Sequence, residues 1–436
     1  MSGGRDDDEE DDLDARLSMP LPLVRPDAAR ARPTAPDEPP AARGAATARG
    51  AGHDDEPAVT RRSAASAMPP TRAPTASPAS PASRATPASA PPPALLQVRD
   101  LRVSFTADGR VSRVLDRVSF SVPRGRTVAL VGESGSGKTV TALSILRLLP
   151  APYASIDGGA IALEDRDLLA LPEREMRAVR GGKIAMIFQE PMTSLNPVYT
   201  VGAQIAEAIR LHRPMSRGDA RLYAVSLLRK VGFPEPEERA SSYPHELSGG
   251  MRQRVMIAMA LAPGPSLLIA DEPTTALDMT TQAQILDLLD RLKAESSMSL
   301  LLIAHDLAVV SELADEIVVL YAGVVVEQGP AREVLAAPSH PYTRSLLRSV
   351  PAPGHRPHRV RGQRARRLPT IPGGPPDLRD LPPGCRFHDR CDAVFARCRA
   401  EAPALYAVPP GAGQHAARCF LLADAGAGRA GEGGAA

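Results

Sequence analysis

The spacing of apolar and polar residues predicts a mixed α/β domain in the middle of the chain. Residues 94–105 (ALLQVRDLRVSF) alternate in the way typical of a half-buried strand. Residues 126–131 (RTVALV) and 266–271 (SLLIAD) are short continuous apolar runs, which are typical of buried strands, whereas residues 140–149 (VTALSILRLL) have a helical pattern. Strands and helices alternate in this way up to about residue 345, which favours an α/β fold.

The composition of the chain ends predicts segments outside this domain. Residues 1–93 begin with an acidic run and continue with Ala, Pro, Ser, Thr and Arg, so we predict that they are disordered. Residues 346–384 are basic and Pro-rich and are predicted to be a solvated linker, with contact to anionic lipid headgroups as the alternative. Residues 385–422, here called the cysteine segment, hold all 4 cysteines, and the Gly/Ala tail 423–436 is predicted to be disordered.

The bulk properties of the chain narrow its class. Of the 436 residues, 43% are hydrophobic and 23% are charged, as in globular proteins, and the net charge of +2 gives no case for nucleic-acid binding. We see no apolar run near the ~20 residues that span a bilayer, and the N-terminus is acidic where a signal peptide would be basic. The sequence therefore predicts a cytoplasmic protein, which could work at a membrane only through other subunits.

Residues 131–140 (VGESGSGKTV) fit the pattern G-x-x-x-x-G-K-[ST], and residues 132–139 are here called the phosphate loop. Glycines let successive backbone N–H groups point at an anion, Lys138 can reach terminal phosphates, and the Thr139 hydroxyl can ligate Mg²⁺. A strand before the loop and a helix after it would place a phosphate at a helix N-terminus, which argues against a merely flexible turn. The residues predicted to contact nucleotide here are Gly132, Glu133, Ser134, Gly135, Ser136, Gly137, Lys138, Thr139 and Val140.

Two further segments carry residues suited to nucleotide chemistry. Asp271, at the end of a buried strand, can hold Mg²⁺, and Glu272 can polarise a water, although an acidic strand end can also simply cap a helix. Ser248, Gly249 and Gly250 precede the helical run MRQRVMIAMALA and predict a second anion-binding helix start, unless they form only a turn and cap. A second such start has a clear use if it binds the nucleotide of another chain.

Taken in order, these motifs resemble the ATP-binding subunits of ABC transporters. The resemblance extends to MIFQEP (186–191), LSGGMRQR (247–254), TALD (275–278) and LLLIAHDL (300–307). It implies an α/β P-loop ATPase over residues 94–345, with a RecA-like core, an antiparallel β part and a helical subdomain at about 190–256. That subdomain is expected to carry a groove for a short helix of a membrane subunit.

The resemblance also implies roles for single residues. Phe105 would stack on adenine, Gln189 would contact Mg²⁺ and the attacking water, Glu272 would be the general base, and His305 would contact the γ-phosphate. Ser248, Gly249 and Gly250 would bind the γ-phosphate held by an opposite subunit, and Asp278 would lie at the dimer interface.

Four stretches narrow the resemblance to the di- and oligopeptide importer branch: residues 187–209, 271–289, 339–351 and 368–378. The branch takes up peptides, and close relatives take up nickel or glutathione. The implied partners are a second related ATPase or a second copy of this chain, two membrane permeases and an extracytoplasmic solute-binding protein, with no nucleic acid. The implied location is the cytoplasmic face of the membrane.

Two other classes remain as alternatives. A soluble ABC ATPase acting on ribosomes or DNA is disfavoured, because the chain has one phosphate-loop motif and no sustained heptads. A metal-sensing regulator built on an inactive ATPase is disfavoured by the presence of both Glu272 and His305.

The cysteines follow the spacing C-x5-C-x6-C-x20-C, at Cys385, Cys391, Cys398 and Cys419. So short a segment lacks a core of its own, which a four-thiolate metal site would offset. Structural zinc usually shows C-x2–4-C pairs, and none is present, whereas four cysteines can hold a [4Fe–4S] cluster. The peptide-importer family shares this cysteine pattern, and some members hold such a cluster. We predict [4Fe–4S], with zinc, then free thiols, as alternatives; disulfides are least favoured, and His388 and His415 are possible substitute ligands.

Overall fold

The computed structural model describes residues 93–189, 194–349, 370–409 and 414–427, which all belong to one unit, Ala85–Ala436. Residues 1–92 and 428–436, which we predict to be disordered, lie outside the described residues. Residues 423–427 of the predicted tail are described and form the end of α14 (Phe420–Ala427), so the prediction of disorder is wrong there. Among the described residues, no helix is both long and apolar enough to cross a bilayer.

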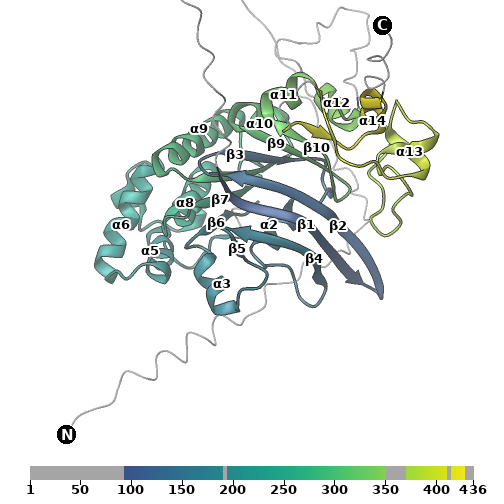
Figure 1. Ribbon diagram of the computed structural model, residues 1–436. Coiled ribbons are helices and arrows are strands. Elements are labelled where there is room, and N and C mark those ends of the chain that lie inside the picture. Colours follow the sequence, from purple (N-terminus) through teal and green to yellow (C-terminus); the bar gives the residue numbers. More distant parts are fainter. Residues whose placement is uncertain (1–92, 190–193, 350–369, 410–413, 428–436) are drawn as a thin grey trace, which may run out of the picture. The chain divides into compact units, whose positions relative to one another are not determined.

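The first sheet is antiparallel and has the strand order β2-β1-β4-β5. Its long strands lie side by side in Figure 1. The alternation in residues 94–105 buries one side of β1, and Val98, paired with Phe120 on β2 and Ile161 on β4, belongs to the core beneath this sheet. The strands are β1 (Ala94–Ala107), β2 (Arg110–Pro123), β4 (Ala154–Leu163) and β5 (Arg166–Asp167).

The second sheet positions the chemistry, with the order β11-β12-β10-β9-β3-β8-β7-β6. Its strands from β9 to β6 are parallel, and β3, β7 and β8 are buried throughout, as their continuous apolar runs require. The strands are β3 (Thr127–Val131), β6 (Ile184–Ile187), β7 (Leu267–Asp271), β8 (Ser299–Ala304), β9 (Glu316–Tyr321), β10 (Val324–Pro330), β11 (Tyr406–Ala407) and β12 (Ala416–Ala417).

Helices cover this sheet, and three of the helices, α5, α6 and α8, pack together as a separate group at one edge (Figure 1). Side-chain caps begin several of them: Thr200, Ser216, Ser248 and Asp278 each accept a backbone N–H of the first turn. Within the described residues, the α-helices are α2 (Lys138–Ile145), α3 (Glu173–Val179), α5 (Val201–His212), α6 (Arg217–Lys230), α7 (Pro236–Arg239), α8 (Gly249–Leu261), α9 (Met279–Ser296), α10 (Leu307–Leu313), α11 (Ala331–Ala336), α12 (Pro341–Arg348), α13 (Ala396–Ala400) and α14 (Phe420–Ala427), and the short 3₁₀ helices are η1 (Pro244–Glu246) and η2 (His388–Arg390).

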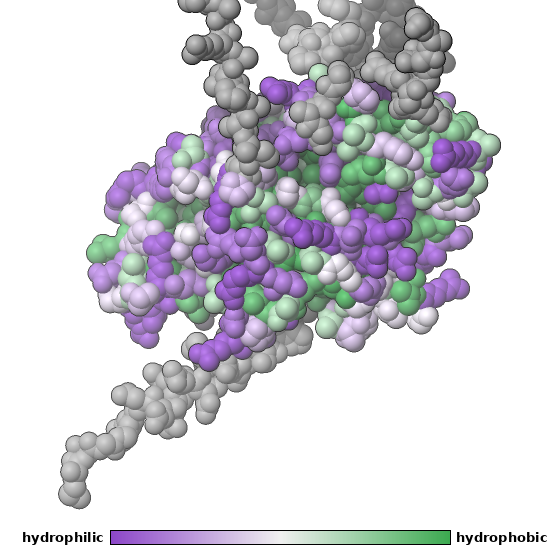
Figure 2. All heavy atoms as spheres, in the orientation of Figure 1, coloured by the Kyte–Doolittle hydropathy of each residue, from purple (hydrophilic) through white to green (hydrophobic). Residues whose placement is uncertain are grey.

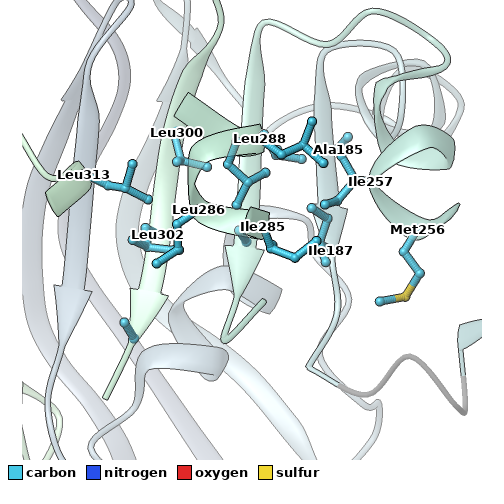
Figure 3. Packing of buried hydrophobic residues seen from close by; sticks show 14 of the residues in the cluster. Ala185, Ile187, Met256, Ile257, Ile285, Leu286, Leu288, Leu300, Leu302 and Leu313 are labelled. Carbon is cyan, nitrogen blue, oxygen red and sulfur yellow. The ribbon is translucent and has the colours of Figure 1, made fainter. Parts of the chain in front are cut away.

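The larger core joins the parallel sheet to α8 and α9. Figure 3 shows Leu300 and Leu302 of β8 and Ile187 of β6 facing side chains of α9, with Ile257 of α8 beside them. On the face drawn in Figure 2, hydrophilic and hydrophobic residues are interspersed.

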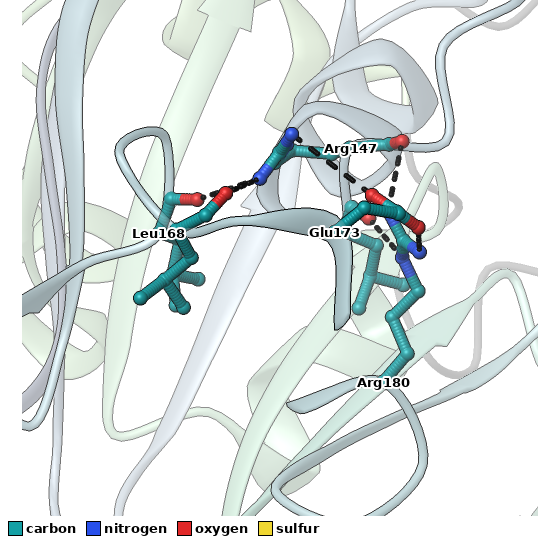
Figure 4. Close-up of polar contacts among 6 residues, drawn as sticks. Arg147, Leu168, Glu173 and Arg180 are labelled. Carbon is teal, nitrogen blue, oxygen red and sulfur yellow. Dashed lines mark hydrogen bonds and ion pairs between the residues drawn. The ribbon is translucent and has the colours of Figure 1, made fainter. Parts of the chain in front are cut away.

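A polar cluster fixes α3 against the end of α2. Arg180 donates from Nε to the carbonyl of Leu146 at 2.7 Å and forms an ion pair with Glu173, while Arg147 donates to the carbonyl of Leu168 at 3.3 Å (Figure 4). These contacts hold the helix that follows the phosphate loop in one orientation.

The predicted linker over residues 346–384 differs in part from the structure. Among its described residues, Ile371, Leu378 and Leu381 pack against the larger core. These scattered apolar side chains are removed from water by packing on the surface of the folded domain. The stretch is therefore bound to the domain in part and is not solvated throughout.

Candidate functional site

The phosphate loop joins β3 to α2, as its strand and helix patterns predict. Gly132 to Gly137 lie between the two elements, and Lys138 to Val140 form the first turn of the helix. A Cβ at Gly132 would collide with the carbonyl oxygen of Leu320, so only glycine allows this close approach of the loop to β9.

Lys138 is buried beneath the loop and folded back onto it. Its Nζ donates to the carbonyl oxygens of Gly132 at 2.9 Å and Glu133 at 3.0 Å. Burial lowers the pKa of Lys138, an effect opposed by the carboxylates of Glu272, Asp271 and Glu133. The strand end that carries Asp271 and Glu272 therefore lies close enough to the loop to act on its cation.

Two buried polar atoms at this point lack a protein partner. Ser136 Oγ and Asp271 Oδ1 are both buried, and neither has a hydrogen-bond partner in the protein. Burial raises the pKa of Asp271, a shift opposed by a hydrogen bond with the Thr139 hydroxyl. Since buried polar atoms are normally satisfied, unpaired oxygens in a phosphate loop and a strand-end carboxylate fit a site for a phosphate and a hard cation.

Three strand ends bring the predicted catalytic residues together around Glu272. Its Oε2 accepts hydrogen bonds from Gln189 Nε2 at 3.0 Å and Thr275 Oγ1 at 3.0 Å, and lies 3.2 Å from His305 Nδ1. Gln189 follows β6, Glu272 follows β7 and His305 follows β8, so the parallel sheet delivers all three to one edge. Glu272 has φ +48°, a left-handed conformation that is rare outside glycine and found at strained functional positions.

The residues predicted to serve another chain's nucleotide form a group of their own. Ser248 accepts a backbone N–H of α8, and a Cβ at Gly250 would collide with the Thr281 side chain. Asp278 accepts from the backbone N–H of Thr281 at 3.0 Å and from its hydroxyl at 2.7 Å. Ser248, Gly249, Gly250 and the start of α9 thus lie together.

Phe105 takes its place in the antiparallel sheet. It pairs with Ser112 on β2 and Ala154 on β4, and its half-buried ring packs against the core of that sheet. Its proposed stacking on adenine stays a prediction.

An apolar groove of about 310 Å³ lies between the ends of α2 and β6 and the helices α5 and α8. Phe188 and Leu211 line it while remaining exposed, Leu211 by 65%. The groove borders α5 and α8, which belong to the helical subdomain. That subdomain is the part expected from the sequence to carry a groove for a short helix of a membrane subunit.

The cysteines share one small cavity of about 10 Å³, which Phe387 and Phe420 also line. All four, Cys385, Cys391, Cys398 and Cys419, are free. Burial raises the pKa of Cys385 to about 11, opposed by the backbone N–H of Phe387 and reinforced by the other thiols.

The predicted metal centre has no support beyond this shared cavity. In the part of the chain that the structure describes, no group of three or more His, Cys, Asp or Glu residues is arranged to hold a metal ion. The substitute ligands have other contacts: His415 Nε2 lies 2.8 Å from Glu327, and His388 Nδ1 lies 2.8 Å from the carbonyl oxygen of Cys385.

Sequence reasoning missed three contacts at this site. Tyr342 Oη accepts the backbone N–H of Glu133 at 2.8 Å, Arg390 forms an ion pair with the Glu133 carboxylate, and Thr275 binds Glu272. Only Thr275 had a signal, its place three residues after Glu272 in the TALD motif. Tyr342 and Arg390 lie in segments with no nucleotide motif.

Comparison with known proteins gives consistent matches. Residues 115–275 match the family described as ABC transporter, and residues 326–398 match the C-terminal region of oligopeptide/dipeptide transporters. The chain is 52% identical over 326 residues to a probable peptide ABC transporter ATP-binding protein of Sinorhizobium fredii, covering 75% of this chain and 94% of that protein. It is 48% identical to the dipeptide transport ATP-binding protein DppD of Escherichia coli and 47% identical to the oligopeptide transport ATP-binding protein AppD of Bacillus subtilis; each alignment covers 76% of this chain and 98% of the relative.

Proposed function

This chain belongs to the family of ATP-binding subunits of peptide ABC transporters, and from that membership we propose that it hydrolyses ATP to drive the import of di- and oligopeptides. The observation that carries the proposal is the group around Glu272, a carboxylate at a strand end beside the phosphate loop, contacted by Gln189 and His305. This arrangement suits activation of a water for attack on a phosphate.

The phosphate loop would bind the nucleotide phosphates through its backbone N–H groups and Lys138. Thr139, Asp271 and Gln189 would hold Mg²⁺, and the unpaired Asp271 Oδ1 fits that task. Bound Mg²⁺ would neutralise charge on the β- and γ-phosphates. Phe105 would stack on adenine.

Glu272 would take the proton of the attacking water. Gln189 and His305 already contact its carboxylate, so they can hold its orientation. In the same proposal, His305 also contacts the γ-phosphate, and Gln189 transmits the nucleotide state to the partner subunit.

A second ATPase would complete the site. We infer that Ser248, Gly249 and Gly250 of one chain bind the γ-phosphate held by the other, with Asp278 at the interface. The second ATPase is a related subunit or another copy of this chain.

The remaining partners follow from the transport role. The apolar groove, with its exposed Phe188 and Leu211, supports contact with a short helix of one of two membrane permeases. An extracytoplasmic solute-binding protein would deliver the peptide, and this chain would lie on the cytoplasmic face of the membrane. The names of the relatives favour peptides over nickel or glutathione as cargo.

For the cysteine segment we propose a [4Fe–4S] cluster, with Zn²⁺ as the alternative. The donor set supports this proposal, because four free cysteines surround one cavity. Their present arrangement does not form a recognisable metal group among the described residues, so no step of the proposed function depends on the metal.

Reconstitution in lipid vesicles tests the function. The full chain would be assembled with the permeases and second ATPase encoded by adjacent genes, and ATP hydrolysis and uptake measured with a labelled dipeptide, nickel or glutathione. Hydrolysis stimulated by the dipeptide and its binding protein is expected. Stimulation by nickel or glutathione alone would reassign the cargo, and full activity from this chain without permeases would contradict a transport role.

A further inference from the structure

The phosphate loop has an ion pair with a residue far along the chain. Arg390 donates from Nη1 to Glu133 Oε2 at 2.7 Å and from Nη2 to Oε1 at 2.9 Å. This bidentate pair fixes the orientation of the carboxylate as well as its distance from the guanidinium. The Arg390 side chain is only 7% exposed and that of Glu133 is 23% exposed. So sheltered a pair is little screened by solvent, unlike the exposed ion pairs elsewhere on this surface.

Arg390 has contacts on its other sides that fix it before it meets Glu133. Its Nε donates to the carbonyl oxygen of Pro372 at 2.9 Å, and Nη1 also contacts Tyr321 Oη at 3.3 Å. The guanidinium lies over the rings of Tyr321 and Phe387, with centroids 5.7 and 5.9 Å away.

The backbone of Arg390 belongs to the turn between two cysteines. Arg390 ends η2, whose first residue, His388, donates its N–H to the carbonyl of Cys385 at 3.0 Å. The next residue, Cys391, donates its N–H to the carbonyl of His388 at 3.3 Å. These two hydrogen bonds place Arg390 in one tight turn between Cys385 and Cys391.

Glu133 has a second attachment outside the nucleotide core. Its backbone N–H donates to Tyr342 Oη at 2.8 Å, and the Tyr342 ring packs against Tyr321 at 4.6 Å and Phe387 at 5.4 Å. The backbone of Glu133 is therefore held by α12 and its side chain by the cysteine segment. The two elements meet in one aromatic cluster.

We propose that Arg390 is a positioning residue for ATP binding, through which the folded cysteine segment sets the geometry and charge of the phosphate loop. Lys138 Nζ donates to the backbone carbonyl oxygen of Glu133 at 3.0 Å, and the Glu133 carboxylate acts to raise the pKa of Lys138. An unpaired Glu133 carboxylate would therefore compete with phosphates for that cation. Arg390 neutralises this carboxylate and fixes its direction. The inference rests on the proposed nucleotide site but goes beyond it, since it makes the loop depend on residues that lie outside every nucleotide motif.

The test is a double-mutant cycle on the full chain, with the dissociation constant of a fluorescent ATP analogue as the readout. Arg390→Met removes the guanidinium and keeps an apolar stem, and we expect about tenfold weaker binding. Glu133→Gln removes the other partner. The combined variant is expected to bind no more weakly than Arg390→Met, because its remaining carboxylate is gone. The matched control is Arg379→Met, an exposed arginine of the same region paired with Asp377, for which we expect a change below about twofold.

Folding is monitored in parallel by thermal unfolding, and Arg390→Lys covers the case in which Arg390→Met does not fold. Lysine keeps the charge but loses the bidentate pair, so an intermediate loss of about threefold is expected. Unchanged affinity in Arg390→Met, or in Arg390→Lys where Arg390→Met does not fold, would overturn the inference. So would independent effects that multiply in the double variant.

Lys138→Ala in the same assay tests the proposed ATP site separately from the inference about Arg390. Normal nucleotide affinity in that variant would mean that the proposed ATP site itself is wrong. Loss of affinity in Lys138→Ala together with normal affinity in Arg390→Met would remove only the inference about Arg390.

Discussion

Replacing Glu272 with glutamine isolates its proposed chemical role from its structural one. The two side chains have nearly the same size, and glutamine keeps one oxygen that can accept hydrogen bonds. In the structure a single oxygen, Oε2, contacts Gln189, Thr275 and His305. A glutamine that turns its carbonyl oxygen to this side preserves these contacts, and it lacks only a group that can accept a proton.

The expected magnitude follows from that difference. A general base contributes about 10²- to 10⁴-fold in rate, which corresponds to about 3–5 kcal/mol of activation free energy. The cost in folding free energy is expected to be about 1 kcal/mol or less, since the three contacts are kept and only their charge assistance is lost. ATP affinity should be retained, because Lys138 and the phosphate loop are unchanged. The closed ATP-bound dimer should therefore accumulate.

The assay compares turnover in the assembled transporter with nucleotide affinity and dimer formation for the same variant. Thr275→Val is the matched control: it removes one hydrogen bond to Oε2 at 3.0 Å but leaves the carboxylate, so a loss of at most about tenfold is expected. Near-normal turnover in Glu272→Gln would refute its role as the base. Equal losses in the two variants would mean that orientation, and not proton transfer, limits the rate.

Two other predictions concern binding and the cysteines. Lys138→Ala should weaken ATP binding itself by at least about tenfold, measured by nucleotide titration, because it removes the buried cation of the phosphate loop; unchanged affinity would contradict this. Anaerobically purified protein should be brown, with iron and sulfide each about four per chain. Stoichiometric zinc in colourless protein would replace the cluster, and four titratable thiols in metal-free protein would remove the site.

Local sequence was enough for the nucleotide motifs and for the strands that carry them. The run from Gly132 to Thr139 predicts its own conformation, since close backbone approach needs glycine and the following helix begins at once. The meeting of Gln189, Glu272 and His305 also follows from the pattern, because each comes after an apolar strand and parallel strands end at the same edge. The sequence alone therefore predicts the fold class.

Tertiary packing decided what the motifs do not contain. The Glu133–Arg390 pair joins positions 257 residues apart. It forms because Tyr321 of β9, Tyr342 of α12 and Phe387, the residue before η2, pack together. Similarly, Ile371 and Leu378 looked like parts of a solvated linker and instead cover the core. Periodicity and motif spacing are short-range properties of the chain, whereas an ion pair or a buried aromatic cluster depends on which surfaces the finished fold places in contact.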